Sequence, residues 1–505
     1  MSSIRTLQDL LAVGRGDAAA IRAPGARDLT YDAFRKLVAG TIATLNGFGI
    51  GRNDRIAIVL PNGPDMATTF VAIATGATAA PLNPAYKADE FEFYMSDLGA
   101  KALIVEAGSK SPAIEVAQKL GITVLTLTPD ANGVAGTFTL SGGTAKAAAN
   151  PGAGGSDDVA LILHTSGTTS RPKIVPLTQA NVTASARNIA TSLEFSEADR
   201  GLNIMPLFHI HGLIAGLLAP LSRGGQIFCT PGFNALKFFA WMEESKPTWY
   251  TAVPTMHQAI LSRAGHNKET IARYPLRFLR SSSASMPPQL IGELEAAFNA
   301  PLIEAYGMTE ASHQMASNPL RGTRKPGAVG LPAGPEIGIM DEDGNLLGIG
   351  EIGEVVIRGD NVTKGYENNP KANDSAFTNG WFRTGDQGMI DAEGHLSLTG
   401  RIKEIIIRGG EKISPREVDE ALLDHPAVEQ VVTFALPHDK LGEEVAAAVV
   451  LREGQSATES ELRDFLSARL AAFKTPRKII FLAEIPKGAT GKLQRIGLAQ
   501  KLGLA

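Results

Sequence analysis

The sequence predicts an α/β protein with a large N-terminal domain and a small α+β C-terminal domain. Short apolar runs such as RIAIVL (55–60) and VALILHT (159–165) alternate with helical patterns such as residues 64–80. This alternation is typical of parallel sheets covered by helices. Residues 330–398 contain short β-like runs separated by Asp-Gly and Glu-Gly turns. They predict a small antiparallel meander or barrel.

A change of pattern near residue 400 predicts a domain boundary. The segments PREVDEALLDHP, VEQVVTFALP and TESELRDFLSARL follow it and have the patterns of a helix, a strand and a second helix. About 100 residues are enough for an independent module. We therefore predict an N-terminal domain over 1–399, a connection at 400–403 and a C-terminal domain over 404–505.

Composition and charge exclude several classes of protein. The 505 residues include 48 basic and 52 acidic side chains, with a formal net charge of −4, which excludes a strongly basic nucleic-acid binder. No run reaches the ~18 apolar residues of a membrane span, and the N-terminus does not resemble a secretory signal. Cys229 is the only cysteine, so an internal disulfide is excluded. We expect a cytoplasmic protein, and the sequence carries no signal for its oligomeric state.

A loop rich in hydroxyl groups carries the strongest chemical signal. Residues 163–173 read LHTSGTTSRPK and follow an apolar run. Backbone N–H groups, hydroxyls and cations at such a loop can bind a polyphosphate. Pro172 breaks the Gly-Lys-Ser/Thr ending of a Walker A motif, so an ordinary P-loop NTPase fits poorly. Taken alone, the segment can also be a polar turn.

Four further motifs follow this loop: YGMTE (306–310), WFRTGD (381–386), GRIK (400–403) and PKGATGK (486–492). In this order, the five motifs resemble the adenylate-forming superfamily of acyl-CoA synthetases, adenylation domains and luciferases. The resemblance covers nearly the whole chain. It implies that ATP activates a carboxylic acid as an acyl-adenylate with release of pyrophosphate, and that the acyl group then passes to CoA with release of AMP. Cations and Mg²⁺ are expected to neutralise the reacting anions.

The resemblance assigns roles to the residues of these motifs. It implies that Thr309 contacts the α-phosphate, that Glu310 binds Mg²⁺ and that Asp386 accepts the ribose hydroxyls. The other ATP-binding residues that it implies are Thr165, Ser166, Gly167, Thr168, Thr169 and Lys173 in the loop, Ser283, Ala284, Ser285, Tyr306 and Gly307 around adenine, and Arg401 beside the ribose. Alternatively, Asp386 caps its own turn and Arg401 pairs with a surface acid.

Two further sets of residues are implied for the two half-reactions. Lys492 is expected to bridge the substrate carboxylate and the α-phosphate during adenylation. Because it lies in the small domain, the resemblance implies a mobile C-terminal domain that closes for this step, with Lys403 at the hinge. Arg408, Gly409 and Gly410 are implied to line the pantetheine tunnel of CoA, and a hairpin turn is compatible with the same residues.

The acyl pocket is predicted from three histidines. The resemblance places His209, a catalytic candidate, at the pocket entrance, with His211, His313 and Ser282 as further substrate-binding residues. Imidazoles and hydroxyls favour a short anionic acid, because a fatty tail would leave them desolvated and unpaired. The histidines can instead be core residues. Arg280 either faces the distal carboxylate or points away along its strand.

The combination of four segments resembles the oxalate:CoA ligases of the superfamily: HTSGTTSRPK, MPLFHIHGL, RSSSASMPP and YGMTEASHQMASNPL. This resemblance implies oxalate as the acid. Malonate, another small acid or a medium-chain acid remain alternatives, and a carrier-protein pantetheine could replace CoA. A nucleotide-binding sensor without catalysis is the alternative outside the enzymes. The presence of Glu310, Asp386 and Lys492 argues against it.

Overall fold

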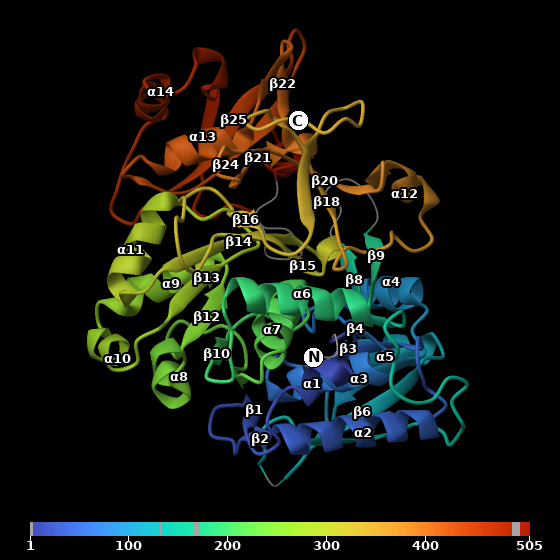
Figure 1. Ribbon diagram of the computed structural model, residues 1–505. Helices are drawn as coiled ribbons and strands as arrows, with labels where there is room; N and C mark the ends of the chain where they lie inside the picture. The colour runs from blue at the N-terminus through green and yellow to red at the C-terminus, as the bar shows by residue number, and fades with distance from the viewer. Residues whose placement is uncertain (1–3, 132, 166–171, 487–494) are drawn as a thin grey trace. The chain divides into compact units, whose positions relative to one another are not determined.

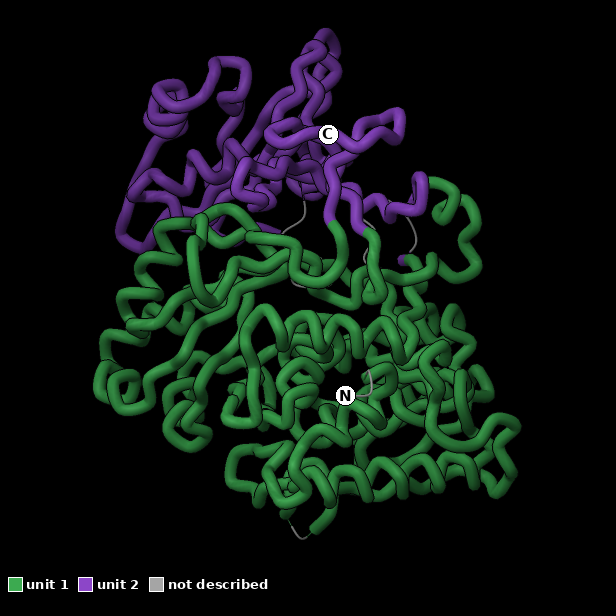
Figure 2. Tube along the Cα trace, viewed as in Figure 1, with its two compact units in different colours: residues 1–165, 173–336, 358–375 green, residues 166–172, 337–357, 376–505 purple. Residues whose placement is uncertain are grey.

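The structure is a computed structural model that describes residues 4–131, 133–165, 172–486 and 495–505. The chain forms two compact units, coloured differently in Figure 2, and each is described by itself below. The first unit comprises residues 1–165, 173–336 and 358–375, and the second comprises 166–172, 337–357 and 376–505. The second unit thus includes part of the predicted N-terminal domain. The hinge at 400–403 stays a prediction, since it concerns movement.

A nine-stranded sheet forms one half of the first unit, with strand order β16-β15-β14-β13-β12-β10-β11-β1-β2. Neighbouring strands from β14 to β1 run parallel, and the pairs at the two ends of the sheet are antiparallel. The strands are β1 (Ala19–Arg22), β2 (Leu29–Thr30), β10 (Arg200–Asn203), β11 (Gln226–Cys229), β12 (Trp249–Ala252), β13 (Phe278–Ser281), β14 (Leu302–Met308), β15 (His313–Ser317) and β16 (Leu331–Pro332).

A seven-stranded sheet forms the other half, in the order β7-β6-β5-β3-β4-β8-β9. Its inner pairs are parallel, and β7 and β9 pair antiparallel at the edges. Both sheets can be followed in Figure 1. The strands are β3 (Arg55–Val59), β4 (Thr78–Pro81), β5 (Ala102–Glu106), β6 (Thr123–Pro129), β7 (Phe138–Ser141), β8 (Val159–Thr165) and β9 (Lys173–Thr178).

The helix predicted over residues 64–80 ends earlier than expected. Helix α3 spans Pro64–Gly76, and the following residues form strand β4. Strand β4 pairs with β3 and β8, and Thr78 Oγ1 donates a hydrogen bond to Val159 O at 2.7 Å. Pairing between distant segments therefore overrides the local helical pattern at this point.

Helices cover both sheets. Helix α3 contacts β4 and β8 of one sheet and β1 and β11 of the other, and every residue from Met66 to Gly76 is buried. The other helices of this unit are α1 (Leu7–Ala12), α2 (Tyr31–Gly47), α4 (Ala88–Leu98), α5 (Ala113–Lys119), α6 (Gln179–Ser192), α7 (Ala219–Leu221), α8 (Phe238–Ser245), α9 (Pro254–Ala264), α10 (Lys268–Arg273), α11 (Pro288–Phe298) and α12 (Pro370–Ala376). The predicted parallel sheets covered by helices are confirmed. Among the described residues, no helix has the length and apolar character needed to cross a membrane.

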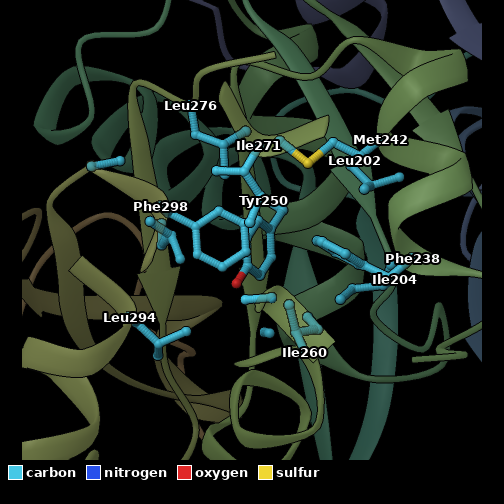
Figure 3. Packing of buried hydrophobic residues seen from close by; sticks show 14 of the residues in the cluster. Leu202, Ile204, Phe238, Met242, Tyr250, Ile260, Ile271, Leu276, Leu294 and Phe298 are labelled. Carbon is cyan, nitrogen blue, oxygen red and sulfur yellow. The ribbon is translucent and has the colours of Figure 1, made fainter. Parts of the chain in front are cut away.

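An aromatic core lies beneath the nine-stranded sheet. Figure 3 shows Tyr250 of β12 among Phe238, Phe298 and aliphatic side chains. The Tyr250 hydroxyl bonds His257 Nδ1 at 3.1 Å, and His257 Nε2 bonds the carbonyl of Arg280 at 3.1 Å. Burial lowers the pKa of His257 to about 4, so the ring is neutral at neutral pH and donates to that carbonyl through Nε2. The core thereby anchors the backbone of β13 at Arg280.

The second unit contains two five-stranded sheets. The first is antiparallel in its described pairs, which confirms the predicted small antiparallel meander or barrel; its strands are β17 (Glu336–Met340), β18 (Gly353–Arg358), β19 (Phe377–Thr378), β20 (Trp381–Ile390) and β21 (Leu396–Arg401). The second comprises β22 (Ile406–Arg408), β23 (Glu411–Ile413), β24 (Val428–His438), β25 (Gly442–Leu451) and β26 (Lys478–Phe481).

Helices α13 (Pro415–Leu423), α14 (Glu459–Ser467) and α15 (Leu498–Lys501) belong to the second unit. Buried side chains of α13 and α14, such as Val418 and Leu462, share one apolar cluster with Val431 of β24 and Val445 of β25. The predicted order of helix, strand and helix is therefore confirmed for this α+β part of the chain.

Candidate active site

The hydroxyl-rich loop connects two antiparallel strands. Thr165 at the end of β8 pairs with Lys173 at the start of β9. A helix would follow the loop in a Walker A motif, so the hairpin agrees with the expectation that this is no ordinary P-loop. Ser166, Gly167, Thr168 and Thr169 lie outside the described residues. Phosphate binding by this loop stays a prediction.

A tyrosine joins the loop to the YGMTE motif. Tyr366 donates a hydrogen bond from its hydroxyl to Glu310 Oε1 at 2.8 Å, and Lys173 Nζ lies 4.3 Å from the centre of the Tyr366 ring. Burial, and then the charge of Glu310, raise the pKa of Tyr366 far above its ordinary value, so the hydroxyl keeps its proton and acts as a donor. One side chain therefore contacts both a predicted phosphate-binding cation and a predicted metal-binding carboxylate.

Glu310 fits the predicted role of a Mg²⁺ ligand. It lies in the short 3₁₀ helix η2 (Thr309–Ala311) and is only 6% exposed, and Thr309 beside it is partly exposed. Within the described part of the chain, no group of three or more His, Cys, Asp or Glu side chains is arranged to hold a metal. Mg²⁺ is commonly bound by one or two carboxylates together with substrate phosphates, which is compatible with a single buried carboxylate here.

Gly307 allows β15 to approach β14 closely. Gly307 follows the buried ring of Tyr306, and a Cβ atom at Gly307 would lie 2.0 Å from His313 O and 3.1 Å from His313 Nδ1. His313 itself has φ of +100°, a conformation that is strained for a residue with a side chain. The glycine therefore determines where the imidazole of His313 lies.

Replacing Gly307 with alanine is expected to lower stability. The new methyl group must displace the backbone of His313, and overpacking of this kind costs about 1–3 kcal/mol. The melting temperature and the kcat/KM for the acid should both fall. Gly40→Ala in helix α2 is the control, because nothing lies within 4 Å of a Cβ there. Equal melting temperatures for Gly307→Ala and wild type would contradict the expected clash.

The predicted histidines His211 and His313 stack on one another. Their ring centroids are 4.9 Å apart at an interplanar angle of 17°, and both side chains are about 1% exposed. His211 begins η1 (His211–Leu218), a π-helix that the sequence did not predict. Such wide helical turns are frequent at functional sites. His211 Nδ1 lies 3.0 Å from Ser283 Oγ, and its Nε2 lies 2.6 Å from Thr251 Oγ1.

Arg280 lies directly behind these histidines and is fully buried. Nη1 lies 3.3 Å from His211 Nε2 and 3.4 Å from Thr251 Oγ1. Nη2 lies 3.1 Å from both His313 Nε2 and Gln314 Oε1. Gln314 is held in turn by Ser192 Oγ and the carbonyl of Ala333. The side chain of Arg280 thus points to the predicted pocket residues His211 and His313, and the expectation that it faces the distal carboxylate of the acid stays a prediction.

The charge of Arg280 lacks a carboxylate partner among the described residues. Its contacts are to imidazole, hydroxyl and amide groups, and Nε is buried with no hydrogen-bond partner there. Burial lowers the pKa of Arg280 to about 9, so the group is still charged at neutral pH. A buried cation held by neutral groups creates a site that favours an anion.

The remaining predicted pocket residues lie in several environments. Ser282 is buried, and its hydroxyl donates to Ala305 O at 2.8 Å, which joins β13 to β14. Ser283 has φ of +75°, whereas Ala284 and Ser285 are exposed. His209 is partly buried beside the ring of Phe208 and precedes η1. Their contacts with substrate or nucleotide stay predictions.

The second unit contains the other predicted site residues. Asp386 and Arg401 face each other on β20 and β21, with Arg401 Nε 3.1 Å from Asp386 Oδ1. Lys403 is exposed in the 3₁₀ helix η3 (Ile402–Glu404). Gly409 and Gly410, with φ of +60° and +95°, form the turn between β22 and β23.

Two details bear on the proposed CoA side of this unit. The hairpin interpretation of Gly409 and Gly410 agrees with the structure, while a CoA-binding role stays a prediction. Arg408 beside them forms an ion pair with the buried Glu444 at 2.6 Å. Lys492 lies outside the described residues.

Comparison with known proteins identifies the family. The AMP-binding enzyme family matches residues 11–367, and the AMP-binding enzyme C-terminal domain matches residues 417–492. The chain belongs to the AMP-binding enzyme family. Together with relatives that are named CoA ligases, this membership confirms the enzyme class predicted from the five motifs, an AMP-forming acyl-CoA ligase. The predicted co-substrates, ATP and CoA, are confirmed together with this class.

Individual members of the AMP-binding enzyme family are similar over almost their whole length. An oxalate–CoA ligase of Arabidopsis thaliana is 46% identical, over 96% of this chain and 95% of the relative. An oxalate–CoA ligase of Saccharomyces cerevisiae is 42% identical, over 94% and 92%. The crystal structure of ATP-bound MatB from Rhodopseudomonas palustris superposes with a TM-score of 0.88 at 29% identity, over 99% of both chains.

Sequence reasoning missed several residues of this candidate site. Tyr366, Thr251 and Gln314 were not singled out, although they contact Glu310 or Arg280. A lone tyrosine, threonine or glutamine carries no spacing signal, and their partners lie far away in the sequence. The one available hint was Arg280, the single charged residue of the short buried strand FLRS.

Proposed function

We propose that this enzyme converts oxalate to oxalyl-CoA with ATP and CoA, through an oxalyl-adenylate. The observation that carries the proposal is the buried Arg280, surrounded by neutral donors and acceptors and without a carboxylate partner among the described residues. A short acid with a second negative charge complements such a pocket. The names of the two similar ligases support the same acid.

The proposed chemistry has two steps. One carboxylate oxygen of oxalate attacks the α-phosphorus of ATP. The bond from the α-phosphorus to the oxygen that bridges it to the β-phosphorus breaks, and pyrophosphate leaves. The thiol of CoA then attacks the activated carbonyl carbon and loses its proton, and AMP leaves with the oxygen that joined the acyl group to phosphorus. In both steps, positive groups must stabilise oxygen atoms that gain charge. Lys173, Thr309 and Lys492 are the residues proposed for the phosphate side.

Bound Mg²⁺ would offset the negative charge of the ATP phosphates. Glu310 would hold the ion, and the hydroxyl of Tyr366 orients one oxygen of that carboxylate. Asp386 is proposed to bind the ribose hydroxyls, with Arg401 beside it. Thioester formation is proposed to use Gly409 and Gly410, after movement of the C-terminal part about Lys403.

The test of oxalate as substrate is a comparison of acids. We expect wild-type kcat/KM to be highest for oxalate among oxalate, malonate, acetate, hexanoate and a cinnamate, because oxalate is the shortest of these acids that carries a second negative charge. CoA consumption and AMP release should be equal for each turnover. A higher kcat/KM for hexanoate or the cinnamate would overturn the assignment of oxalate and leave the ligase class unchanged.

His313→Ala should lower kcat/KM for oxalate by about tenfold to a thousandfold. The imidazole is buried beside Arg280, and its loss removes a donor from the proposed acid site. ATP binding, measured by calorimetry without acid, should be unchanged. Unchanged kcat/KM for oxalate in a folded His313→Ala variant would remove His313 from the acid site.

The remaining proposals concern location and partners. We propose a cytoplasmic location, which agrees with the single cysteine, Cys229, buried in β11. The proposed partners are the acid, ATP and CoA. Nucleic acid is not a proposed partner, because the net charge of −4 provides no strong overall attraction for phosphate backbones.

A further inference from the structure

We infer that Arg280 fixes the buried histidines His211 and His313 as neutral tautomers with hydrogen on Nδ1. The groups that the proposed acid site offers to a ligand are then hydrogen-bond donors. Arg280 is a positioning residue in this scheme and acts on the acid through His211, Ser283 and His313. The inference deepens the proposed function, because a site that only donates selects a carboxylate over a neutral group. The tautomers themselves can be measured without any substrate.

The guanidinium group of Arg280 determines which nitrogen of each imidazole accepts a hydrogen bond. A guanidinium group has N–H donors and no acceptor. The contacts of Nη1 with His211 Nε2 and of Nη2 with His313 Nε2 therefore require each Nε2 atom to accept. An Nε2 atom that accepts carries no hydrogen. A neutral imidazole then has its hydrogen on Nδ1.

The positive charge of Arg280 disfavours protonation of His211 and His313. The two rings are stacked, buried and adjacent to Arg280. Protonation of either histidine would place a second positive charge in a space where no described carboxylate pairs with Arg280. His257, the other ionisable group bonded to Arg280, contacts its carbonyl and adds no negative charge. Because each Nε2 atom accepts from Arg280, neither ring is an imidazolium, whose two nitrogens both carry hydrogen, and both rings are therefore neutral.

The direction of the remaining bonds follows. With hydrogen on Nδ1, His211 donates to Ser283 Oγ at 3.0 Å, and the hydroxyl of Ser283 keeps its own hydrogen for another acceptor. Thr251 accepts from Arg280 Nη1 and donates to His211 Nε2. For His313, the Nδ1 atom lies on the side of Gly307, next to the YGMTE motif. The Nδ1 hydrogens of the two rings therefore point away from Arg280, one toward Ser283 and the other toward the side of Gly307.

The direct test is nitrogen-15 NMR of the full chain, with labelled histidine and without substrate at neutral pH. Long-range proton–nitrogen correlations distinguish an imidazole with hydrogen on Nδ1 from one with hydrogen on Nε2 and from imidazolium. His211→Gln and His313→Gln assign the two signals among the nine histidines. We expect both to be neutral with hydrogen on Nδ1. A hydrogen on Nε2 of either ring in wild type would overturn the inference.

Arg280→Met removes the charge and the donors at similar length. We expect at least one of the two histidines to change tautomer or become protonated, and kcat/KM for oxalate to fall roughly tenfold to a hundredfold. Arg280→Lys should restore little, because an ammonium group lacks the planar fork that reaches both rings. Arg263→Met, exposed on α9, is the matched control and should leave both signals and the kcat/KM unchanged. Unchanged tautomers in a folded Arg280→Met variant would contradict the inference.

Ser283→Ala and Ser282→Ala test whether the Ser283 hydroxyl is the last donor in the series of hydrogen bonds from Arg280 through His211. Ser283→Ala should lower kcat/KM for oxalate more than Ser282→Ala, because the Ser282 hydroxyl already donates to Ala305 O. A larger loss in Ser282→Ala would contradict the proposed direction of the bonds. If both tautomers are as expected but oxalate is a poor substrate, the proposed acid is wrong and the role of Arg280 stands. If oxalate is the preferred acid but either ring carries its hydrogen on Nε2, the inference about Arg280 is wrong and the proposed function stands.

Discussion

Lys492→Ala is expected to slow adenylate formation by roughly 10²-fold or more and to leave thioester formation from synthetic oxalyl-adenylate largely intact. The reason is that the lysine supplies positive charge between the substrate carboxylate and the α-phosphate, which matters only while both are present. Pyrophosphate exchange measures the first half-reaction. CoA consumption from added adenylate measures the second.

Two comparisons make the Lys492 result specific. Lys478→Ala, exposed on β26, should leave both half-reactions unchanged. A bulky residue at Gly409 or Gly410 should slow thioester formation more than adenylation, because both glycines have positive φ in the turn of the proposed CoA site. Equal damage to both half-reactions by Lys492→Ala would contradict the assignment of separate states to the two steps.

Glu310→Gln should raise the Mg²⁺ concentration needed for half-maximal activity and slow turnover, each by roughly tenfold to a hundredfold. The amide keeps the shape of the side chain, and its Oε1 can still accept from Tyr366, but the negative charge that attracts Mg²⁺ is lost. Calorimetry of ATP binding over a range of Mg²⁺ concentrations provides a readout that does not depend on turnover.

Tyr366→Phe is expected to have the same kind of effect as Glu310→Gln, but a smaller one. It removes only the hydroxyl that bonds Glu310 and keeps the ring beneath Lys173, so a smaller rise in the Mg²⁺ requirement is expected. Glu336→Gln, an exposed glutamate on β17, is the control. Wild-type Mg²⁺ dependence in Glu310→Gln would show that Glu310 is not the ligand.

The fold class and the enzyme family could be predicted because both depend on signals that are local in the sequence. Apolar runs such as 55–60 and 159–165 became β3 and β8, since strands buried on both faces need continuous apolar side chains. The five motifs each contain their chemistry within a few residues. The amino-acid sequence alone therefore shows their resemblance to the adenylate-forming superfamily, and it also indicates His211 and His313 as pocket candidates.

Residues whose roles depend on distant partners needed the tertiary structure. Arg280 meets His211 across 69 positions of the sequence, and Tyr366 meets Glu310 across 56. Whether Arg280 faces the histidines depends on the register of β12, β13 and β14, because neighbouring side chains of a strand point to opposite faces. The π-helix at His211 and the strand β4 depend likewise on packing against other elements.

The sequence by itself therefore determined the family, the reaction class and the chemical types available for the acid site. Only the tertiary structure decided that a buried guanidinium lies behind the two imidazoles with no described carboxylate as its partner. The physical reason is that a side chain's charge and hydrogen-bonding groups are set by its own chemistry. Its burial, its neighbours and hence the direction of its hydrogen bonds are properties of the packed fold.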